Sequence, residues 1–224
     1  MERSVVLTAD GSSSVFVPYF DEYYHSVHGA LQESVHVFID AGFLFKINNS
    51  KELSILEIGF GTGLNTFLTF LEAEKYNAKI DYVTIEKFPL ERNIYEALHF
   101  NTITDDANKQ ARFMSMHTID WNKKSKVNTH FYLTKLHIDV LDFKASNMFD
   151  IIYFDAFAPT AQKELWTTAV FTAMYDALKN EGVLVTYCAK GEVKRILKSV
   201  GFVVQSLPGP IGKREMTRAI KLNK

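Results

Sequence analysis

The sequence has little of several features that would fix a protein's class at once. Cys188 is its only cysteine, which excludes an internal disulfide and is typical of a protein of the reducing cytoplasm. No uninterrupted apolar run approaches the roughly 18 residues of a membrane span, and the first residues lack the apolar core of a signal peptide. We therefore expect a cytoplasmic protein that has no membrane partner.

Common metal and phosphate motifs are missing as well. No His/Cys cluster has the spacing of metal ligands, no serine lies in a nucleophile elbow, and no lysine follows a glycine-rich phosphate loop. The formal net charge of −1 provides no overall attraction to nucleic acid. We expect neither a metal centre nor phosphate-loop chemistry.

The composition itself is that of an ordinary globular protein, with 47% apolar and 23% charged residues. A length of 224 residues suits one domain with a sizeable core, and no linker, repeat or low-complexity segment interrupts it. We predict a single domain over residues 1–224, made of an N-terminal cap (1–50) and a catalytic core (51–224).

The most informative stretch is LSILEIGFGTGLN, residues 53–65. Its first residues form an apolar run that predicts a buried strand, and the apolar positions from residue 64 onward have helical spacing. Between them, Gly59, Gly61 and Gly63 allow a sharp turn and leave the main chain open to a ligand. A strand, a glycine turn and a helix N-terminus together are typical of a nucleotide-binding corner.

The glycine spacing indicates which ligand this corner binds. It differs from the G-x-G-x-x-G of dinucleotide-binding proteins, and Glu57, two residues before Gly59, would repel a pyrophosphate. An acid at this place suits a ligand that carries an ammonium group. The pattern E-x-G-x-G-x-G resembles motif I of class I S-adenosylmethionine (SAM) methyltransferases. A purely structural glycine turn is the alternative.

The rest of the chain alternates strands with helices. After strand 53–58 we predict strands at 80–86, 131–140, 149–159, 181–189, 202–207 and 214–222. We predict helices after Pro89, at 162–178 and 191–200, and around 106–119 in a polar insertion. The fold class is therefore α/β and Rossmann-like, with a mostly parallel seven-stranded sheet that has an antiparallel edge strand. A hairpin over residues 4–17 and a helix near 30–39 precede the sheet and would cap it.

Four acids fall at the carboxyl ends of predicted strands, where open α/β sheets bind ligands. They are Glu57, Glu86, Asp139 and Asp155. Glu86 is suited to ribose hydroxyls, while Asp139 could accept from an adenine amino group or simply cap a turn. Asp155 could hydrogen-bond an acceptor amine and help its proton leave, or it could only stabilise its loop. Two residues later, Phe157 offers an aromatic surface for a base.

Taken as a whole, the chain resembles the methyltransferase domain of the MnmC family, which makes 5-methylaminomethyl-2-thiouridine in tRNA, and its stand-alone MnmD-like relatives. The resemblance covers about residues 15–220. It rests on GALQESVHVFI (29–39), LEIGFGTGLN (56–65), IEKFPL (85–90), FDAFAP…LWT (154–167) and GKREMTRA (212–219). It implies SAM-dependent N-methylation of the 5-aminomethyl group of (2-thio)uridine at tRNA wobble position 34.

The resemblance also implies roles for single residues. Around the methionine part of SAM it places Glu57, Gly59, Gly61, Gly63 and Asn65. It places Glu86 at the ribose, Asp139 near adenine and Asp155 at the acceptor amine. The bifunctional members continue into an FAD-dependent oxidase domain, whereas this sequence ends at Lys224. We therefore expect only the methylation here, on an aminomethyl substrate supplied by another enzyme. A smaller departure is Ala156, where bifunctional members carry glycine.

Two further regions are expected to contact the RNA. In the N-terminal cap, Tyr24 and Glu33 would lie near the substrate, although the tyrosines there could equally just cover the sheet edge. From Val185 to Lys224 nine Lys/Arg residues face only two acids, which indicates a basic region for tRNA phosphates. The candidates are Lys194, Arg195, Lys198, Lys213 and Arg214. Any single one of them could be an ordinary solvated charge.

Two other functions stay open at this point. The same acids would suit SAM-dependent methyl or aminopropyl transfer to a small amine, which would proceed without RNA. Alternatively, the chain could be a catalytically silent module that binds SAM or RNA. A nicotinamide dehydrogenase fits least, because the glycine spacing is wrong for it.

Overall fold

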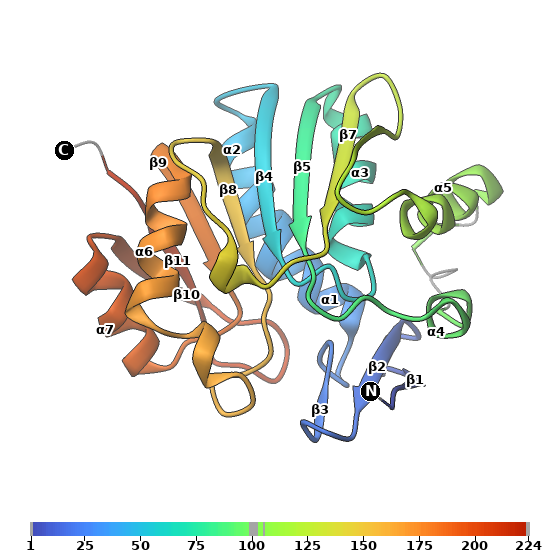
Figure 1. Ribbon diagram of the computed structural model, residues 1–224, viewed down its shortest axis with the longest axis horizontal. Coiled ribbons are helices and arrows are strands. Elements are labelled where there is room, and N and C mark those ends of the chain that lie inside the picture. Colours follow the sequence, from blue (N-terminus) through green and yellow to red (C-terminus); the bar gives the residue numbers. More distant parts are fainter. Residues whose placement is uncertain (1, 99–102, 105, 223–224) are drawn as a thin grey trace.

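The computed structural model describes residues 2–98, 103–104 and 106–222. Within this part of the chain a central sheet has eight strands in the order β10-β11-β9-β8-β4-β5-β7-β6 (Figure 1). Their bounds are β4 (Glu52–Ile58), β5 (Lys79–Ile85), β6 (Lys124–Lys126), β7 (Phe131–Leu136), β8 (Phe149–Phe154), β9 (Leu178–Thr186), β10 (Val203–Pro208) and β11 (Glu215–Ile220). The five strands β9, β8, β4, β5 and β7 pair in parallel, and β11 pairs antiparallel with both β9 and β10. The predicted fold class is confirmed, with β6 as an additional short strand antiparallel to β7.

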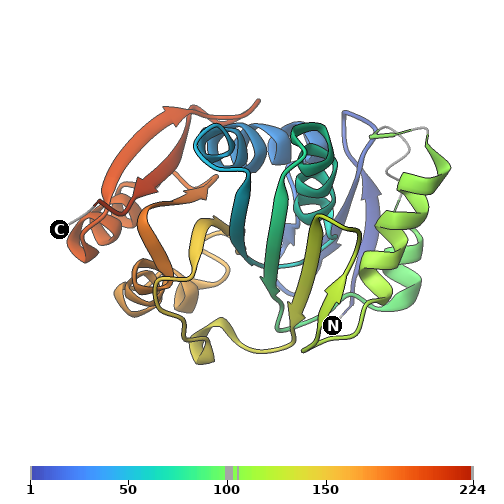
Figure 2. The same ribbon diagram turned by 90° about the horizontal axis from the view of Figure 1, so that it is seen from above.

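Helices cover both faces of this sheet (Figure 2). One face carries α1 (Ala30–Ser34), the π-helical segment η1 (Val35–Phe43), α2 (Leu44–Ile47) and α3 (Leu64–Tyr76), and the other carries α6 (Thr168–Ala177) and α7 (Gly191–Val200). Successive residues of β4 serve the two faces in turn, because Ile55 packs in one apolar cluster and Leu56 in the other. Burial on both sides explains why the parallel strands read as continuous apolar runs rather than alternating ones.

The N-terminal cap is a small antiparallel sheet of β1 (Ser4–Leu7), β2 (Ser13–Val17) and β3 (Glu22–Tyr23). It lies against the carboxyl ends of the central strands (Figure 1). The β1–β2 hairpin turns at Asp10, whose carboxylate accepts hydrogen bonds from Thr8 Oγ1 at 2.7 Å and from the Gln32 amide at 3.1 Å. The same carboxylate therefore closes the hairpin and ties it to α1.

Several predicted boundaries were wrong. Pro89 does not open the next helix, because α4 (Arg92–Glu96) begins three residues later with Glu91 before it. The strand predicted over 131–140 ends at Leu136, and Asp139 instead caps the short 3₁₀ helix η2 (Val140–Asp142). In place of one helix over 162–178 there is η3 (Lys163–Leu165) followed by α6, which starts where the Thr167 hydroxyl caps it.

The polar insertion holds the predicted helix, α5 (Ala107–Thr118), which Asp106 caps, and then β6. Positions 101, 102 and 105 of this insertion lie outside the described residues. Among the described residues, no helix is long and apolar enough to cross a membrane. A cytoplasmic location stays a prediction.

Candidate functional site

A cavity of about 780 Å³ lies at the carboxyl ends of β4, β5 and β8, between the central sheet and the N-terminal cap. Ten of the residues predicted from the sequence line it. They are Tyr24, Glu33, Gly59, Gly61, Asn65, Glu86, Asp139, Asp155, Phe157 and Lys213. Segments that are far apart in the sequence thus meet in one chamber. Six other predicted residues do not line it, namely Glu57, Gly63, Lys194, Arg195, Lys198 and Arg214.

The glycine turn is shaped by contacts within the protein itself. Gly59 has φ +93°, and a Cβ there would lie 2.7 Å from the backbone oxygen of Asp155. Gly61 has φ +49° and lies under the Tyr24 ring, while its N–H donates to Glu86 Oε2 at 3.1 Å. These two glycines therefore let the turn touch the Asp155 loop and the N-terminal cap at once.

Glu57 does not contact the cavity as predicted. Its side chain is fully buried beneath the turn, where Oε2 accepts from Thr66 Oγ1 at 3.0 Å. Burial, reinforced by the neighbouring Asp155 charge, raises the pKa of Glu57 to about 8, so the carboxyl is mostly uncharged at neutral pH. A buried, protonated acid cannot attract a ligand's ammonium group directly, and Glu57 supports the turn from below.

Gly63 also departs from its predicted place beside the ligand. It has φ +74° and precedes α3, and a Cβ there would lie 3.1 Å from the Phe60 ring and 3.2 Å from His117 Nε2. The absence of a side chain lets these two rings pack against the turn. Gly63 therefore makes room for packing within the protein and does not line the cavity.

Asp155 lies at the floor of the cavity, directly after β8. Its Oδ2 accepts from Asn65 Nδ2 at 2.8 Å, and its backbone N–H donates to the Ile58 carbonyl at 3.1 Å. Burial, with the nearby Glu33 charge, raises the pKa of Asp155 to about 7, although the hydrogen bond from Asn65 opposes the shift. Near neutral pH this carboxyl is therefore poised between its acid and base forms.

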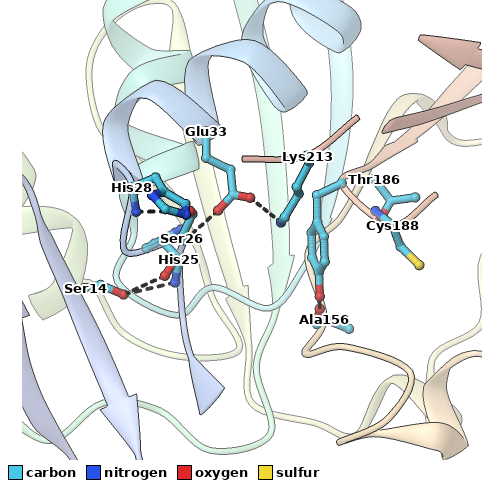
Figure 3. Close-up of polar contacts among 10 residues, drawn as sticks. Ser14, His25, Ser26, His28, Glu33, Ala156, Thr186, Cys188 and Lys213 are labelled. Carbon is cyan, nitrogen blue, oxygen red and sulfur yellow. Dashed lines mark hydrogen bonds and ion pairs between the residues drawn. The ribbon is translucent and has the colours of Figure 1, made fainter. Parts of the chain in front are cut away.

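Glu33 and Lys213 form an ion pair inside the cavity (Figure 3). Glu33 is 5% exposed, and its other oxygen accepts from the Ser26 amide at 2.7 Å. The Lys213 ammonium lies 4.0 Å from the centre of the Tyr187 ring, and the Tyr187 hydroxyl donates to the Ala156 carbonyl at 2.8 Å. The last sheet strands are thereby connected both to α1 and to the Asp155 loop.

Sequence reasoning missed Tyr187, although its position near the carboxyl end of the strand predicted over 181–189 could have indicated it. It also missed Arg3 and Lys87, which line the cavity. Arg3 donates to the carbonyls of Phe88 and Pro89 at 2.6 and 2.9 Å. These contacts tie the first residues of the chain to the loop after β5.

The part of the cavity lining that follows β5 and β7 combines two carboxylates with apolar side chains. Glu86 accepts from the amides of Gly61 and Phe88 at 3.1 and 2.8 Å, which fixes its orientation. Asp139 caps η2 through the Leu141 amide at 3.0 Å and pairs with Lys87 at 2.6 Å, so its turn-capping role is real. It still lines the cavity. The apolar wall beside it consists of Ile85, Ile138, Val140 and Leu141.

The predicted basic surface is only partly as expected. Arg195, Lys198 and Arg214 are exposed. Lys194 does not point freely outward, because its ammonium binds Glu215 and Ser206, each at 2.6 Å. Among the five predicted basic residues, Lys213 is the member that reaches the cavity. No cluster of three or more His, Cys, Asp or Glu within the described ranges could hold a metal ion.

Comparison with known proteins gives one family match. The profile described as S-adenosyl-L-methionine-dependent methyltransferase matches residues 101–222, more than half of the chain. Curated relatives are the tRNA 5-methylaminomethyl-2-thiouridine biosynthesis bifunctional protein MnmC of Legionella pneumophila, 28% identical over 94% of this chain, and that of Idiomarina loihiensis, 30% identical over 88%. The matched regions are 36% and 35% of those proteins, so the chain spans about a third of their length.

The fold has a counterpart among solved structures. The crystal structure of MnmC2 from Aquifex aeolicus superposes with a TM-score of 0.82 over 99% of this chain and 71% of that one. Its sequence identity is 23%, so the likeness shows a shared fold.

Proposed function

The chain belongs to the S-adenosyl-L-methionine-dependent methyltransferase family, and from this premise we propose that it methylates the 5-aminomethyl nitrogen of a (2-thio)uridine at tRNA wobble position 34. The observation that carries the proposal is the Asp155 carboxyl, which lines the cavity and has a pKa raised to about 7 by burial. The names of the relatives support tRNA as the substrate, and the anticodon region is where wobble uridine lies.

The charge of the cavity and the groups that line it support SAM as its ligand. Six acids line it against three Lys/Arg residues, an excess that suits a cofactor with a sulfonium and an ammonium group. The buried Oδ1 of Asn65 has no hydrogen-bond partner among the described residues and would accept from that ammonium. Glu86 would hold the ribose, with Asp139 and the apolar wall from Ile85 to Leu141 at the adenine.

SAM, when bound, supplies an electrophilic methyl group. The protein's task is to present a neutral amine, because an alkyl ammonium has no lone pair for the new bond. The hydrogen bond from Asn65 occupies one Asp155 oxygen and orients the carboxyl. Asp155 would accept a hydrogen bond from the substrate nitrogen and take its proton, a transfer that its raised pKa makes less unfavourable than transfer to an ordinary aspartate.

Aromatic side chains would receive the uracil ring. The Phe157 ring lies 5.1 Å from those of both Phe20 and Tyr24, which forms an aromatic wall beside Asp155. A base splayed out of a single-stranded loop is recognised by stacking on such rings. The Glu33–Lys213 pair would bound the acceptor pocket on its other side.

The alternative with a small amine, by methyl or aminopropyl transfer, is less favoured because of the cavity mouth. Large apolar side chains there are strongly exposed, including Tyr19 at 77% and Ile211 at 65%. A free polyamine has no need of such a rim, whereas nucleotides around a wobble base would pack on it. A silent module is also disfavoured, because it has no use for a buried carboxyl with a pKa near neutrality.

The function is tested with tRNA that carries 5-aminomethyluridine in place of the finished modification. Such tRNA presupposes an upstream enzyme that installs the aminomethyl group. We expect label from methyl-labelled SAM to appear at wobble uridine, and the 2-thio and oxo forms can be compared directly. Label on spermidine or another free amine, with none on tRNA, would move the assignment to the small-amine reaction.

The exposed cations of α7 should strengthen binding of tRNA through its phosphates. We expect Arg195→Glu combined with Lys198→Glu to raise the KM for tRNA several-fold and to reduce the slope of log K against log salt by about one per lost contact. The SAM affinity should not change. As a control, Lys75→Glu with Lys79→Glu makes the same charge change at exposed lysines of α3 and β5, which pair with Glu72 and Glu52. Equal tRNA kinetics for both double variants would contradict the assignment.

A further inference from the structure

A second cavity, of about 420 Å³, lies beside the first and shares the Phe60 side chain with it. Its volume falls within the range of small-ligand pockets. It is lined by Phe60, Leu90, Arg92, Tyr95, His117, Thr118, Ile119, Asp120 and Trp121. Nothing in the proposed methyl transfer uses this second cavity, which we call the ring pocket.

Four of its nine lining residues carry rings. Tyr95 of α4 stacks on His117 of α5 with ring centres 4.7 Å apart and planes 14° apart. Phe60 of the glycine turn meets Trp121 edge-on at 6.0 Å. The rings come from three separate segments, so the fold, and not one local helix, assembles the pocket.

A buried cation holds these rings from behind. Lys135 of β7 is fully buried, and its ammonium donates to the His117 carbonyl at 2.6 Å. The same ammonium lies 4.6 Å from the centre of the Trp121 ring and 5.3 Å from that of Phe60. No ion pair of Lys135 occurs among the described residues. Burying a cation without an ion pair is unfavourable for stability, and the His117 carbonyl, the two ring faces and the charge of nearby Asp120 offset that cost.

The ring pocket is also joined to the glycine turn. Because a carbonyl can only accept, His117 donates its Nε2 proton to the Thr62 oxygen at 3.1 Å and is therefore the Nε2–H tautomer. The missing Cβ of Gly63 leaves room for Phe60 and His117. The two cavities thus have a fixed spacing set by one short segment of chain.

We propose that the ring pocket binds a nucleobase next to the methylated uridine in the same RNA, an inference that rests on the proposed function. Its walls match a planar, uncharged ring, and a splayed single-stranded base is held by such stacking. Two charged residues line the pocket: Arg92, whose Nε pairs with Glu96 at 2.7 Å, and Asp120, whose carboxylate lies 3.6 Å from the Lys123 ammonium. The remaining guanidinium N–H groups and the carboxylate can donate to and accept from a base edge. With one charge of each sign, the ring pocket differs from the acidic first cavity and does not favour a cationic ligand such as SAM.

The test measures RNA binding and single-turnover methylation for wild type and for Tyr95→Ala, Tyr95→Phe and the control Tyr132→Ala. Tyr132 is an exposed β7 tyrosine that lines neither cavity. We expect Tyr95→Ala to raise the Kd of an anticodon stem-loop about ten-fold, the effect of one lost stacking partner. Tyr95→Phe should restore binding, and the SAM Kd should be the same in all four proteins, which also verifies folding.

The recognised nucleotide is found with stem-loops that are abasic at single positions flanking the wobble uridine. At that nucleotide, base removal should weaken wild-type binding about ten-fold and leave Tyr95→Ala unaffected, since both changes delete the same contact. Additive losses at every position, or wild-type affinity in Tyr95→Ala, would overturn the inference. So would a free nucleotide that quenches Trp121 fluorescence without competing with RNA. If wild type methylates no RNA at all, the proposed function itself fails. If wild type methylates RNA and Tyr95→Ala binds and methylates it equally well, only the ring-pocket inference is refuted.

Discussion

Replacing Asp155 with alanine should lower kcat/KM for methyl transfer by about 10²–10⁴-fold, the range that a positioned acid or base contributes. The carboxyl is buried at the cavity floor, fixed by Asn65 at 2.8 Å, and has a pKa of about 7. Without it the substrate ammonium has no adjacent group to take its proton. The affinity for SAM should remain within a few-fold, because Glu86 and Asp139, which we propose to hold the ribose and adenine, follow strands other than the one that carries Asp155.

Two further variants make this result specific. Asp155→Asn keeps the shape and can still accept from Asn65, but it cannot take a proton, and its activity should be nearly as low as that of Asp155→Ala. Asp142→Asn changes an exposed carboxylate that does not line the cavity and should be fully active. An active Asp155→Asn enzyme would exclude proton transfer to this carboxyl and leave it only an orienting role.

The stability of Asp155→Asn shows whether lost activity is a folding defect. In the folded protein the pKa of Asp155 is raised from 3.8 to about 7, so the folded state holds this proton more tightly than the unfolded chain. Ionised Asp155 therefore lowers wild-type stability progressively as pH rises from about 4 to about 7, and the deficit is constant above that. Asp155→Asn should gain stability relative to wild type over the same window, by a few kcal/mol at most. Urea unfolding at pH 4.5 and pH 8 measures the difference.

Gly59→Ala should damage both stability and activity. The position has φ +93°, and the new Cβ would lie 2.7 Å from the Asp155 backbone oxygen, closer than real Cβ contacts come. We expect a loss of roughly 2–4 kcal/mol of unfolding free energy from strain and steric conflict. Displacing Asp155 to relieve the conflict should lower kcat on the order of 100-fold, since small misplacements of reacting groups are costly.

Gly191→Ala is the matched control for that substitution. Gly191 begins α7, and a Cβ there would meet the far end of the flexible Arg195 side chain at 3.3 Å. Alanine is the better helix former, so stability should be unchanged or slightly higher and activity should be normal. If thermal denaturation shows equal Tm values for the two variants, the contact between the glycine turn and the Asp155 loop is less rigid than the structure indicates.

Periodicity in the sequence was sufficient to predict the sheet and the strand ends that Glu86 and Asp155 follow, whereas the strand predicted to end near Asp139 stops at Leu136. It could not predict the direction of a side chain at a strand end. Glu57 lies only two residues before Gly59, yet its carboxyl points beneath the turn, where packing against Thr66 decides its place. Lys135 shows the same limit, because a lysine in a strand reads as a solvated charge until the rings that cover it are known.

Contacts between residues far apart in the chain could not be predicted from the sequence, for another reason. Lys194 was predicted to face solvent because helical spacing puts it on the polar side of α7. The structure instead pairs it with Glu215 of β11, a neighbour that only the sheet topology provides. Likewise, residues of α4, α5 and the glycine turn line the ring pocket, and no local sequence pattern predicts that these segments meet.

The ion pair between Glu33 and Lys213 joins residues 180 positions apart in the chain. During synthesis, α1 leaves the ribosome long before the segment that carries Lys213. Until that segment arrives, Glu33 has the Ser26 amide but not its cation, and the acceptor pocket lacks a wall. Contacts of such long range form late and slow the folding of a domain. The nascent protein therefore completes its substrate site among the last steps of folding, after the glycine turn has formed from residues close in sequence.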